Sequence, residues 1–425
     1  MFKNYIQHKL EKYVKKYLEK HPDIKLVCVT GSVGKTSTKL AIATVLAQQY
    51  RVRLHEGNHN TNLSAPLAIL GIKYPENVHN PFSWLKVFKA ARKVIKSPST
   101  VDVIVQELGT DKPGEIADFG RYLRPDIGVI TAVTPEHMEF FGTLDAVAAE
   151  ELTLANFSKI AVINRDDIDD KYAQLLTNTT INTYGTSGLA EYSFQEDDFS
   201  IETGYKGRFT SPDFNDIPAT VKVVGEHNIR PVVGAVTVAV CFGMDIAAIV
   251  KGVEEIRPAP GRMNPLKGMK DSILLDDTYN SSPAAADMAL QTLINLPAPQ
   301  HIAVLGSMNE LGATSAQEHA RIGSLCHPGL IDYVVTVGDE AAQYLAPVAI
   351  QNGCAVKSFP DAISAGAYVH KVIDPRAVVL LKGSQGGIFV EETTKILLRN
   401  TSDDKQLVRQ SPAWLEAKEQ FFSKF

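Results

Sequence analysis

Short apolar segments rich in β-branched residues alternate with amphipathic segments along most of the chain. The segments 24–30, 101–108, 127–133 and 159–164 have the length and composition of buried strands, and helical patterns lie between them. Strands that alternate with helices in this way favour a parallel sheet covered by helices on both faces. The first part of the chain is therefore predicted to be an α/β domain.

A polar stretch at 185–225 interrupts this alternation, and its short alternating runs predict a small antiparallel excursion. Helical patterns then return, and a boundary is predicted at 257–265, where three prolines lie close to a glycine. Four further strand-like segments, separated by helices, follow at 272–279, 301–308, 331–338 and 377–384. We therefore expect a central domain at 24–256 and a second, Rossmann-like α/β domain at 257–425.

The first 23 residues form a separate segment that is predicted to be one basic amphipathic helix. Lysines lie between apolar residues that recur near helical spacing, namely Tyr5, Ile6, Leu10, Tyr13, Val14 and Leu18. The segment lacks the apolar core of a signal peptide. Such a helix either packs on the domain behind it or contacts a membrane surface or a partner.

The composition is that of a soluble globular protein. A length of 425 residues agrees with two or more domains. The net charge of −5 argues against a general nucleic-acid binder. The four cysteines are scattered and form no CxxC motif, which is typical of a reducing compartment, so we expect a cytoplasmic protein.

The sequence VTGSVGKTSTK, which begins at Val29, follows a predicted strand and opens a predicted helix. Backbone N–H groups of such a glycine turn hold phosphate oxygens, a lysine adds charge, and the next hydroxyl can bind Mg²⁺. Gly31, Gly34, Lys35 and Thr36 are of the right types, although Val29 stands where the usual loop has its first glycine. The context predicts a nucleotide site.

Two further residues lie at the ends of predicted strands, where ligands bind in open α/β sheets. Glu107 ends the strand 101–108 and could supply oxygen to a metal ion. His137 follows the strand 127–133. Each could instead be structural, as an exposed loop glutamate or a lone histidine.

Ten motifs occur in the order typical of the Mur ligases, and the sequence resembles that family, most closely its MurF type. The motifs are TGSVGKTSTK, GNHNTNLSAPLAILG, ELGTDKPGEI, TAVTPEHMEFFGTLDAVA, INRDD, GEHN, PGRMN, DDTYNSSP, LGSMNELG and KGS. They run from about residue 24 to about residue 390. The resemblance also accounts for the loop, because this family uses the short form that lacks the first glycine.

The resemblance implies an ATP- and Mg²⁺-dependent ligase. ATP phosphorylates a carboxylate to an acyl phosphate, and an amine then displaces the phosphate. The expected substrates are a small peptidoglycan precursor and an amine such as D-Ala-D-Ala. Two anions must be brought together in such a reaction, so cations must cluster around them.

The resemblance also assigns site residues. The catalytic residues are Lys35, His137, Glu151 and Arg262. The ATP site comprises Gly31, Ser32, Val33, Gly34, Lys35, Thr36, Ser37, Asn228 on the adenine side, Arg262 at the phosphates and Asp277 at the ribose. The Mg²⁺ ligands are Thr36 and Glu107 for one ion and His137 and Glu151 for a second. The substrate residues are Asn58, Asn60, Tyr279, Asn280, Lys382 and Ser384.

The sequence departs from the family at three places. Glu151 occupies the position of a lysine whose carbamate bridges to the metal, and we expect its carboxylate, or that of Glu150, to replace the carbamate. Pro231 replaces the second asparagine of the HNxxN helix, which is tolerated in a first helical turn. The resemblance also implies an N-terminal domain that binds the UDP-sugar before the phosphate loop. Here about 24 residues precede the first strand, and the helical insert at 72–100 is too short to supply such a domain.

Two other functions agree with the sequence. One is a related amide ligase that acts on a substrate without UDP, such as a folylpolyglutamate synthase type of enzyme. The other is a nucleotide-binding scaffold without catalysis. Retention of all the expected phosphate and metal groups argues against the scaffold.

Overall fold

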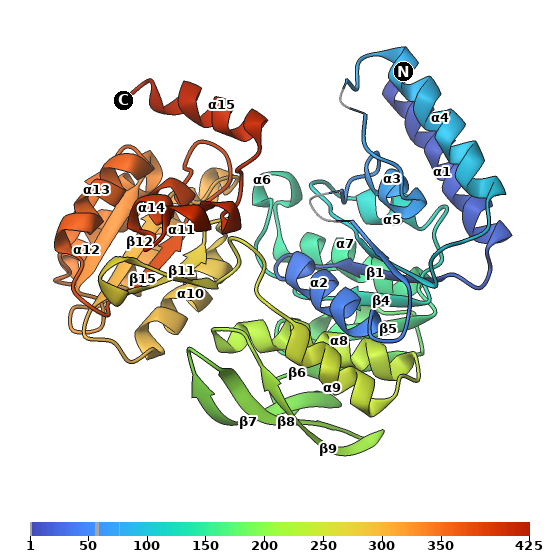
Figure 1. Ribbon diagram of the computed structural model, residues 1–425, viewed down its shortest axis with the longest axis horizontal. Coiled ribbons are helices and arrows are strands. Elements are labelled where there is room, and N and C mark those ends of the chain that lie inside the picture. The colour runs from blue at the N-terminus through green and yellow to red at the C-terminus, as the bar shows by residue number, and fades with distance from the viewer. Residues whose placement is uncertain (1, 56–58, 76) are drawn as a thin grey trace.

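The computed structural model describes residues 2–55, 59–75 and 77–425 and has two sheets, each inside its own α/β unit (Figure 1). The strand order in the first sheet is β2-β3-β1-β4-β5-β6-β7-β8-β9. Its strands are β1 (Lys25–Thr30), β2 (Val52–Leu54), β3 (Val103–Glu107), β4 (Ile127–Ile130), β5 (Ile160–Asn164), β6 (Ile181–Gly185), β7 (Tyr192–Ser200), β8 (Gly204–Ser211) and β9 (Phe214–Val221).

The strands from β2 to β7 pair in parallel, and β7, β8 and β9 pair antiparallel. The predicted parallel sheet and the predicted antiparallel excursion are thus both confirmed. The helices α2 (Lys35–Leu46), α8 (Ile229–Cys241) and α9 (Ile246–Glu255) cover one face of the sheet. The other face is covered by α3 (Ala65–Leu70), α5 (Glu115–Phe119) and α7 (Leu144–Phe157).

The second sheet has the strand order β10-β11-β15-β12-β13-β14, with β10 antiparallel to β11 and the other pairs parallel. Its strands are β10 (Asn264–Lys267), β11 (Ile273–Asp277), β12 (His301–Gly306), β13 (Tyr333–Val337), β14 (Val356–Phe359) and β15 (Val378–Lys382). The four predicted strands of this part are present as β11, β12, β13 and β15. The short strands β10 and β14 were not predicted.

Helices cover both faces of the second sheet. One face carries α10 (Pro283–Asn295), α11 (Ser315–Ser324) and α12 (Ala346–Gln351), and the other carries α13 (Ala362–Val372) and α14 (Glu391–Leu397). The C-terminal helix α15 (Pro412–Phe422) lies beyond this layer (Figure 1).

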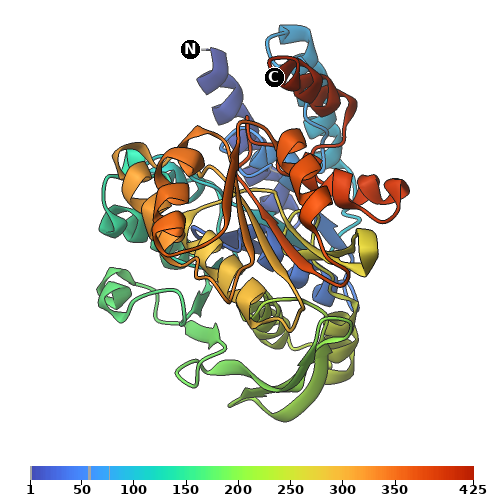
Figure 2. The same ribbon diagram turned by 90° about the vertical axis from the view of Figure 1, so that its left-hand side faces the viewer.

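The N-terminal helix α1 (Phe2–Lys20) packs against α4 (Pro81–Lys96) and extends beyond the sheet with it (Figures 1 and 2). The buried face of α1 carries Ile6, Leu10 and Val14, which confirms the predicted amphipathic helix. The helical pattern of the insert is confirmed by α4. No helix among the described residues is long and apolar enough to cross a membrane.

A buried ion cluster attaches the C-terminal segment to the second sheet. Glu391 is fully buried and accepts bonds of 2.7 Å from both Nε and Nη2 of Arg409, while Lys418 Nζ lies 2.9 Å from it. Arg409 also donates to the backbone carbonyls of Thr278, at 2.6 Å, and Tyr279, at 3.0 Å. The loop after β11 is therefore held in place by the C-terminal segment.

We expect Glu391→Gln to lower the free energy of unfolding by about 3–5 kcal/mol, because it leaves the buried guanidinium of Arg409 without its anion and leaves Lys418 with Glu392 alone. Urea unfolding measures this change. Glu419→Gln, on the exposed side of α15, is the control and should stay within about 0.5 kcal/mol of the parent. Equal stabilities of the two variants would contradict the role of the cluster.

Candidate active site

The loop between β1 and α2 is shaped by two glycines with positive φ angles. Gly31 has φ 129°, and a Cβ atom on it would lie 2.9 Å from Thr131 N and 2.8 Å from Ala132 N. Gly34 has φ 86° and stands directly before α2. Only glycine combines such angles with such a close approach. The backbone N–H groups at the start of α2 consequently form a cradle of the kind that binds phosphate.

Lys35 lies in the loop with its amine turned back onto the backbone. Its Nζ contacts the carbonyl of Gly31, donates to the carbonyl of Ser32 at 3.2 Å, and lies 3.2 Å from Glu136 Oε2. Burial opposes the charge on Lys35, but Glu136 and two further glutamates outweigh it and raise the pKa of the amine. Lys35 therefore stays protonated and cationic at neutral pH.

Glu107 ends β3 beside the loop, as predicted, and its carboxylate is buried. Thr36 Oγ1 donates to Oε2 at 3.0 Å, Asn60 Nδ2 donates to Oε1 at 3.1 Å, and Lys39 Nζ lies 3.2 Å from Oε2. Burial alone would raise the pKa of Glu107, but Lys39 and Lys35 outweigh it and lower the pKa. An ionised carboxylate next to a hydroxyl is the kind of oxygen donor set that Mg²⁺ prefers.

Within the described ranges, no group of three His, Cys, Asp or Glu side chains could hold a metal ion by itself. The pair formed by Thr36 and Glu107 fits Mg²⁺ only together with oxygens from elsewhere, as when the ion is shared with substrate phosphates.

His137 contacts acidic side chains from both halves of the chain. Its Nδ1 lies 2.9 Å from Glu310 Oε2, and its Nε2 lies 3.5 Å from Asp111 Oδ1 and 3.8 Å from Glu136 Oε1. His137 stands before the short helix α6 (Met138–Phe141), and Glu310 belongs to the loop after β12. The imidazole thus bridges the two α/β units.

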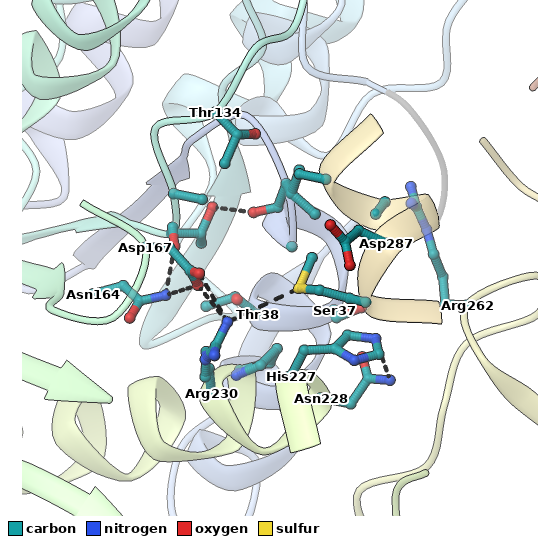
Figure 3. A pocket seen from close by; sticks show the side chains of 18 of the residues that line it. Ser37, Thr38, Thr134, Asn164, Asp167, His227, Asn228, Arg230, Arg262 and Asp287 are labelled. Atoms are coloured by element: carbon teal, nitrogen blue, oxygen red, sulfur yellow. Dashed lines mark hydrogen bonds and ion pairs between the residues drawn. The ribbon is translucent and has the colours of Figure 1, made fainter. Parts of the chain in front are cut away.

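A cavity of about 350 Å³ lies on one side of the loop, between α8 and the start of α10 (Figure 3). Its volume is in the range of small-ligand sites. Of the predicted ATP residues, those that line it are Val33, Gly34, Ser37, Asn228, Arg262 and Asp277. Asn228 Nδ2 donates to the carbonyl of Val224 at 2.7 Å, so its side chain is fixed at the wall.

The residues that line this cavity include an ion pair between Arg230 and Asp167, which was not predicted. Arg230 Nη1 lies 2.8 Å and 3.0 Å from the two carboxylate oxygens of Asp167, and Asn164 Nδ2 donates to Asp167 at 2.6 Å. Figure 3 shows Arg230 and Asp167 pointing toward one another from α8 and from the loop after β5. His227 lies beside them, and burial lowers its pKa to about 4, so its ring is neutral.

Asp277 and Lys382 form a buried ion pair at the carboxyl ends of β11 and β15. Lys382 Nζ lies 2.6 Å from Asp277 Oδ2 and donates to the carbonyl of Asn280 at 3.0 Å, and Met263 N donates to Asp277 Oδ1 at 3.1 Å. Both side chains line the first cavity. Lys382 was predicted to face the amine substrate, and the structure places it at the first cavity in a pair with Asp277.

Ser384, also predicted to face substrate, is buried and lines neither cavity. Its hydroxyl donates to the carbonyl of Ser281 at 3.2 Å and accepts from Asn309 N at 2.9 Å. The structure therefore gives Ser384 a structural position that ties two loops together.

Arg262 lies where the two α/β units meet. Its guanidinium is 4.1 Å from the ring centroid of Tyr279, and its Nε is buried with no hydrogen-bond partner among the described residues. A buried N–H without a partner is costly. An anionic ligand in the cavity would satisfy it, which agrees with the predicted phosphate contact.

A second cavity, of about 490 Å³, lies on the other side of the loop. Of the predicted residues, those that line it are Ser32, Val33, Gly34, Lys35, Thr36, Asn60, Glu107, His137, Arg262, Tyr279 and Asn280. The two cavities share Val33, Gly34, Arg262 and Ala285. They therefore meet at the phosphate loop. Asn58, another predicted substrate residue, lies outside the described residues.

The structure does not bring Glu151 to the metal site. Its side chain is 2% exposed, lines neither cavity, and accepts from Thr30 Oγ1 at 2.5 Å beneath the loop. Its neighbour Glu150 accepts from the backbone N–H groups of Gly114 and Ile116, each at 2.7 Å. The position of Glu151 therefore does not support a metal-ligand role, because α7 presents it to the end of β1 and not to the cavities.

Pro231 lies in the first turn of α8, as expected, and lines the first cavity. Most of the residues that were not predicted from the sequence lie inside motifs that had been recognised, whereas Arg230 lies two residues beyond GEHN. Asp167 and Asn164 belong to INRDD, His227 to GEHN, Glu136 to TPEH and Glu310 to NELG. The signal was present, but nothing in the sequence pairs these side chains across the cavities.

Two family models match most of the chain. "Mur ligase middle domain" matches residues 29–239, and "Mur ligase, glutamate ligase domain" matches residues 261–385.

Curated relatives include two UDP-N-acetylmuramoyl-tripeptide–D-alanyl-D-alanine ligases. The Bacillus subtilis protein is 28% identical over 330 residues, which are 77% of this chain and 66% of that protein. The Escherichia coli protein is 27% identical over 383 residues, which are 88% of this chain and 77% of that protein. The chain thus spans about two thirds to three quarters of the length of these relatives.

Solved structures agree in fold. MurF from Acinetobacter baumannii has a TM-score of 0.74 at 22% identity, and the match covers 91% of this chain and 78% of the Acinetobacter chain. MurF from Thermotoga maritima in complex with ADP has a TM-score of 0.74 at 21% identity, with 94% and 84% covered. Folylpolyglutamate synthase from Mycobacterium tuberculosis has a TM-score of 0.63 at 15% identity, with 88% and 92% covered.

We expect Gly31→Ala to weaken ATP binding at least about tenfold, because a side chain at this backbone angle costs about 1–3 kcal/mol and would push the loop away from Thr131. Calorimetric titration measures the affinity. Gly188→Ala, at an exposed position where a Cβ atom meets nothing within 4 Å, is the control and should bind as the parent does. Unchanged affinity in Gly31→Ala would contradict the cradle.

The pKa of Glu151 gives a pH dependence of stability. Burial raises this pKa from 4.5 to about 7, against the opposing effect of Lys35. Between these two pH values the folded state keeps a proton on Glu151 that the unfolded state releases. The protonated carboxyl therefore contributes to stability fully below pH 4.5, and this contribution is lost as the pH rises to about 7.

We expect Glu151→Gln to flatten the decline in stability between pH 5 and 7, by up to about 1.4 kcal/mol per pH unit. Urea unfolding at pH 5, 6 and 7 checks this. Glu202→Gln, in an exposed turn, should keep the parent's slope. The same slope in Glu151→Gln and the parent would show that Glu151 is already ionised in the folded protein.

Proposed function

This chain belongs to the Mur ligase family, and from that premise we propose that it is an ATP-dependent, ADP-forming ligase that joins a carboxylate to an amine. The observation that carries the proposal is the meeting of two cavities at one phosphate loop. ATP occupies the first cavity, so that its terminal phosphate reaches the second, where the carboxylate is held. Mur ligases and their MurF members are ligases of this type.

We propose that the carboxylate substrate is a peptidoglycan precursor and that the amine is D-Ala-D-Ala or a similar dipeptide. The names of the curated relatives support this choice. An amide ligase that acts on a substrate without UDP is the alternative, since the folylpolyglutamate synthase has a similar fold. The match to both Mur ligase domain models favours a ligase over a non-catalytic nucleotide-binding scaffold.

Cations of the chain bring the two anions together. Lys35 supplies a positive charge to the second cavity, next to the shared Gly34, and Arg262 from the linker between the two units lines both cavities. Thr36 and Glu107 would hold Mg²⁺, which when bound supplies further positive charge to the phosphates. We propose that a second Mg²⁺ would bind beside His137 only together with oxygens of the substrates, since no three of the described side chains could hold it alone.

The acidic groups around His137 suit the second half of the reaction. The incoming amine arrives as an ammonium ion and must lose a proton before it attacks the acyl phosphate. Glu310, exposed at the second cavity and 2.9 Å from His137 Nδ1, can hold the ammonium ion and accept this proton. Because Glu310 comes from the second α/β unit, the amine would be positioned only when both units face the cavity.

We further propose that the chain divides at residues 256 and 257 and acts in the cytoplasm. This division falls in the segment between the end of α9 at Glu255 and the start of β10 at Asn264. All four cysteines are free, which suits a reducing compartment.

The test is phosphate release from ATP with three substrate pairs. These are UDP-MurNAc-tripeptide with D-Ala-D-Ala, the UDP-free muropeptide with D-Ala-D-Ala, and folate with glutamate. We expect release with a muropeptide pair, and we expect Lys35→Ala to lower it to about 1% or less, because the loss of a charge-stabilising group costs roughly 3–4 kcal/mol in the transition state.

Lys251→Ala, on the exposed side of α9, is the control and should release phosphate at the parent's rate. Release with the folate pair alone would overturn the peptidoglycan assignment. No release with any pair would overturn the assignment as a ligase.

A further inference from the structure

The helices α1 and α4 line neither cavity, yet they hold a large share of the positive charge. Their 19 and 16 residues contain eleven lysines and arginines and two glutamates, one of them, Glu11, buried. The whole chain has a net charge of −5, so the rest of the chain is more acidic than the total indicates. The proposed ligase reaction makes no use of this basic pair of helices.

This charge is not used to hold the fold together. None of the eleven basic side chains takes part in an ion pair with another described residue. Two of them stay within the helix pair: Lys9 Nζ lies 4.3 Å from the ring centroid of Phe88, and Arg92 Nε donates to Tyr13 Oη at 3.2 Å. The remaining cations point to solvent and are open to an anionic partner.

The two faces of α4 differ sharply. Trp84, Val87, Phe88 and Ala91 are buried against α1 and the domain behind it. The opposite face is exposed and carries Phe82, Leu85, Lys86, Lys89, Arg92, Lys93 and Lys96. Helices that lie on membranes combine lysines and arginines with exposed apolar side chains, and the exposed face of α4 carries both.

The exposed large apolar residues of both helices lie at the same end of the helix pair. The helices run in parallel, because Ile6 packs near Trp84 and Val14 near Ala91. Both helices begin at the top of Figures 1 and 2, beyond the sheets. The large apolar side chains exposed there are Phe2, at 48%, Tyr5, at 56%, Phe82, at 72%, and Leu85, at 58%.

We propose that α1 and α4 together dock this protein on an anionic lipid surface. The four apolar side chains at the tip enter the headgroup region, and the exposed lysines and arginines contact lipid phosphates. Neither helix can span a bilayer, so the contact is peripheral. Lipid is favoured over a folded partner because the exposed large apolar side chains are confined to one end, whereas the exposed cations continue along the helix face.

Co-sedimentation of the full chain with vesicles tests the proposal. We expect binding to vesicles of one part phosphatidylglycerol and three parts phosphatidylcholine at about 0.1 M salt, and at least tenfold weaker binding to phosphatidylcholine alone or in about 0.5 M salt. Phosphate release from ATP should be retained by the bound enzyme, because α1 and α4 line neither cavity.

Two variants separate the charge from the apolar tip. The triple variant Lys86→Glu, Lys89→Glu, Lys93→Glu should weaken binding at least about tenfold, and Phe82→Ser with Leu85→Ser should weaken it several-fold at either salt concentration. The controls change equally exposed residues elsewhere: Lys251→Glu with Lys357→Glu and Lys371→Glu, and Leu189→Ser with Ile350→Ser. Thermal melting confirms that each variant is folded.

Binding that the matched controls reduce as much as the α4 variants would overturn the proposal, since it would reflect overall charge or hydrophobicity. Failure of the parent to bind the anionic vesicles would also overturn it and would leave the helix face to a protein partner. Either result is independent of the ligase assignment, because the substrate-pair test of that assignment measures phosphate release in the absence of vesicles.

Discussion

The close approach of the loop at Gly31 to the end of β4 is the constraint on which the site depends. The backbone of Gly31 passes so near Thr131 that no side chain fits between them. This contact turns the chain sharply from β1 into α2 and opens the amide groups at the start of α2 to a ligand. Because β3, β1 and β4 are neighbours in one parallel sheet, Glu107 and the loop that carries His137 end at the same edge.

Charge is arranged around this edge in layers. Lys35 and Lys39 hold Glu107 ionised, while Glu151 beneath them is deprived of water and keeps a raised pKa. On the far side, Asp277 is neutralised by Lys382. The site is thus rich in buried cations that already have partners, and Arg262 is the one whose Nε still lacks a partner among the described residues. An anionic ligand complements that arrangement without rearranging the fold.

The sequence was sufficient for the parallel sheets, the antiparallel excursion and the loop, because these depend on local periodicity and on glycines with special backbone angles. It was not sufficient for pairings between distant side chains. Lys382 looked free to meet a substrate, but β15 lies beside β11 and delivers it to Asp277. Glu151 looked like a metal ligand, but the rotation of α7 turns it toward Thr30. The short strands β10 and β14 were not predicted, because their sequences NPLK and VKSF lack the continuous apolar, β-branched run that indicates a buried strand.

The parallel packing of α1 on α4 also bears on how the chain folds. About sixty residues separate the end of α1 from the start of α4, including β1, α2 and β2. The apolar face of α1, with Ile6 and Leu10, packs on both α3 and α4, so its partners emerge from the ribosome only after β1, α2 and β2 have been synthesised. Helices with such distant partners fold late, since the intervening loop must close first. The first helix to be synthesised is consequently among the last to reach its native contacts.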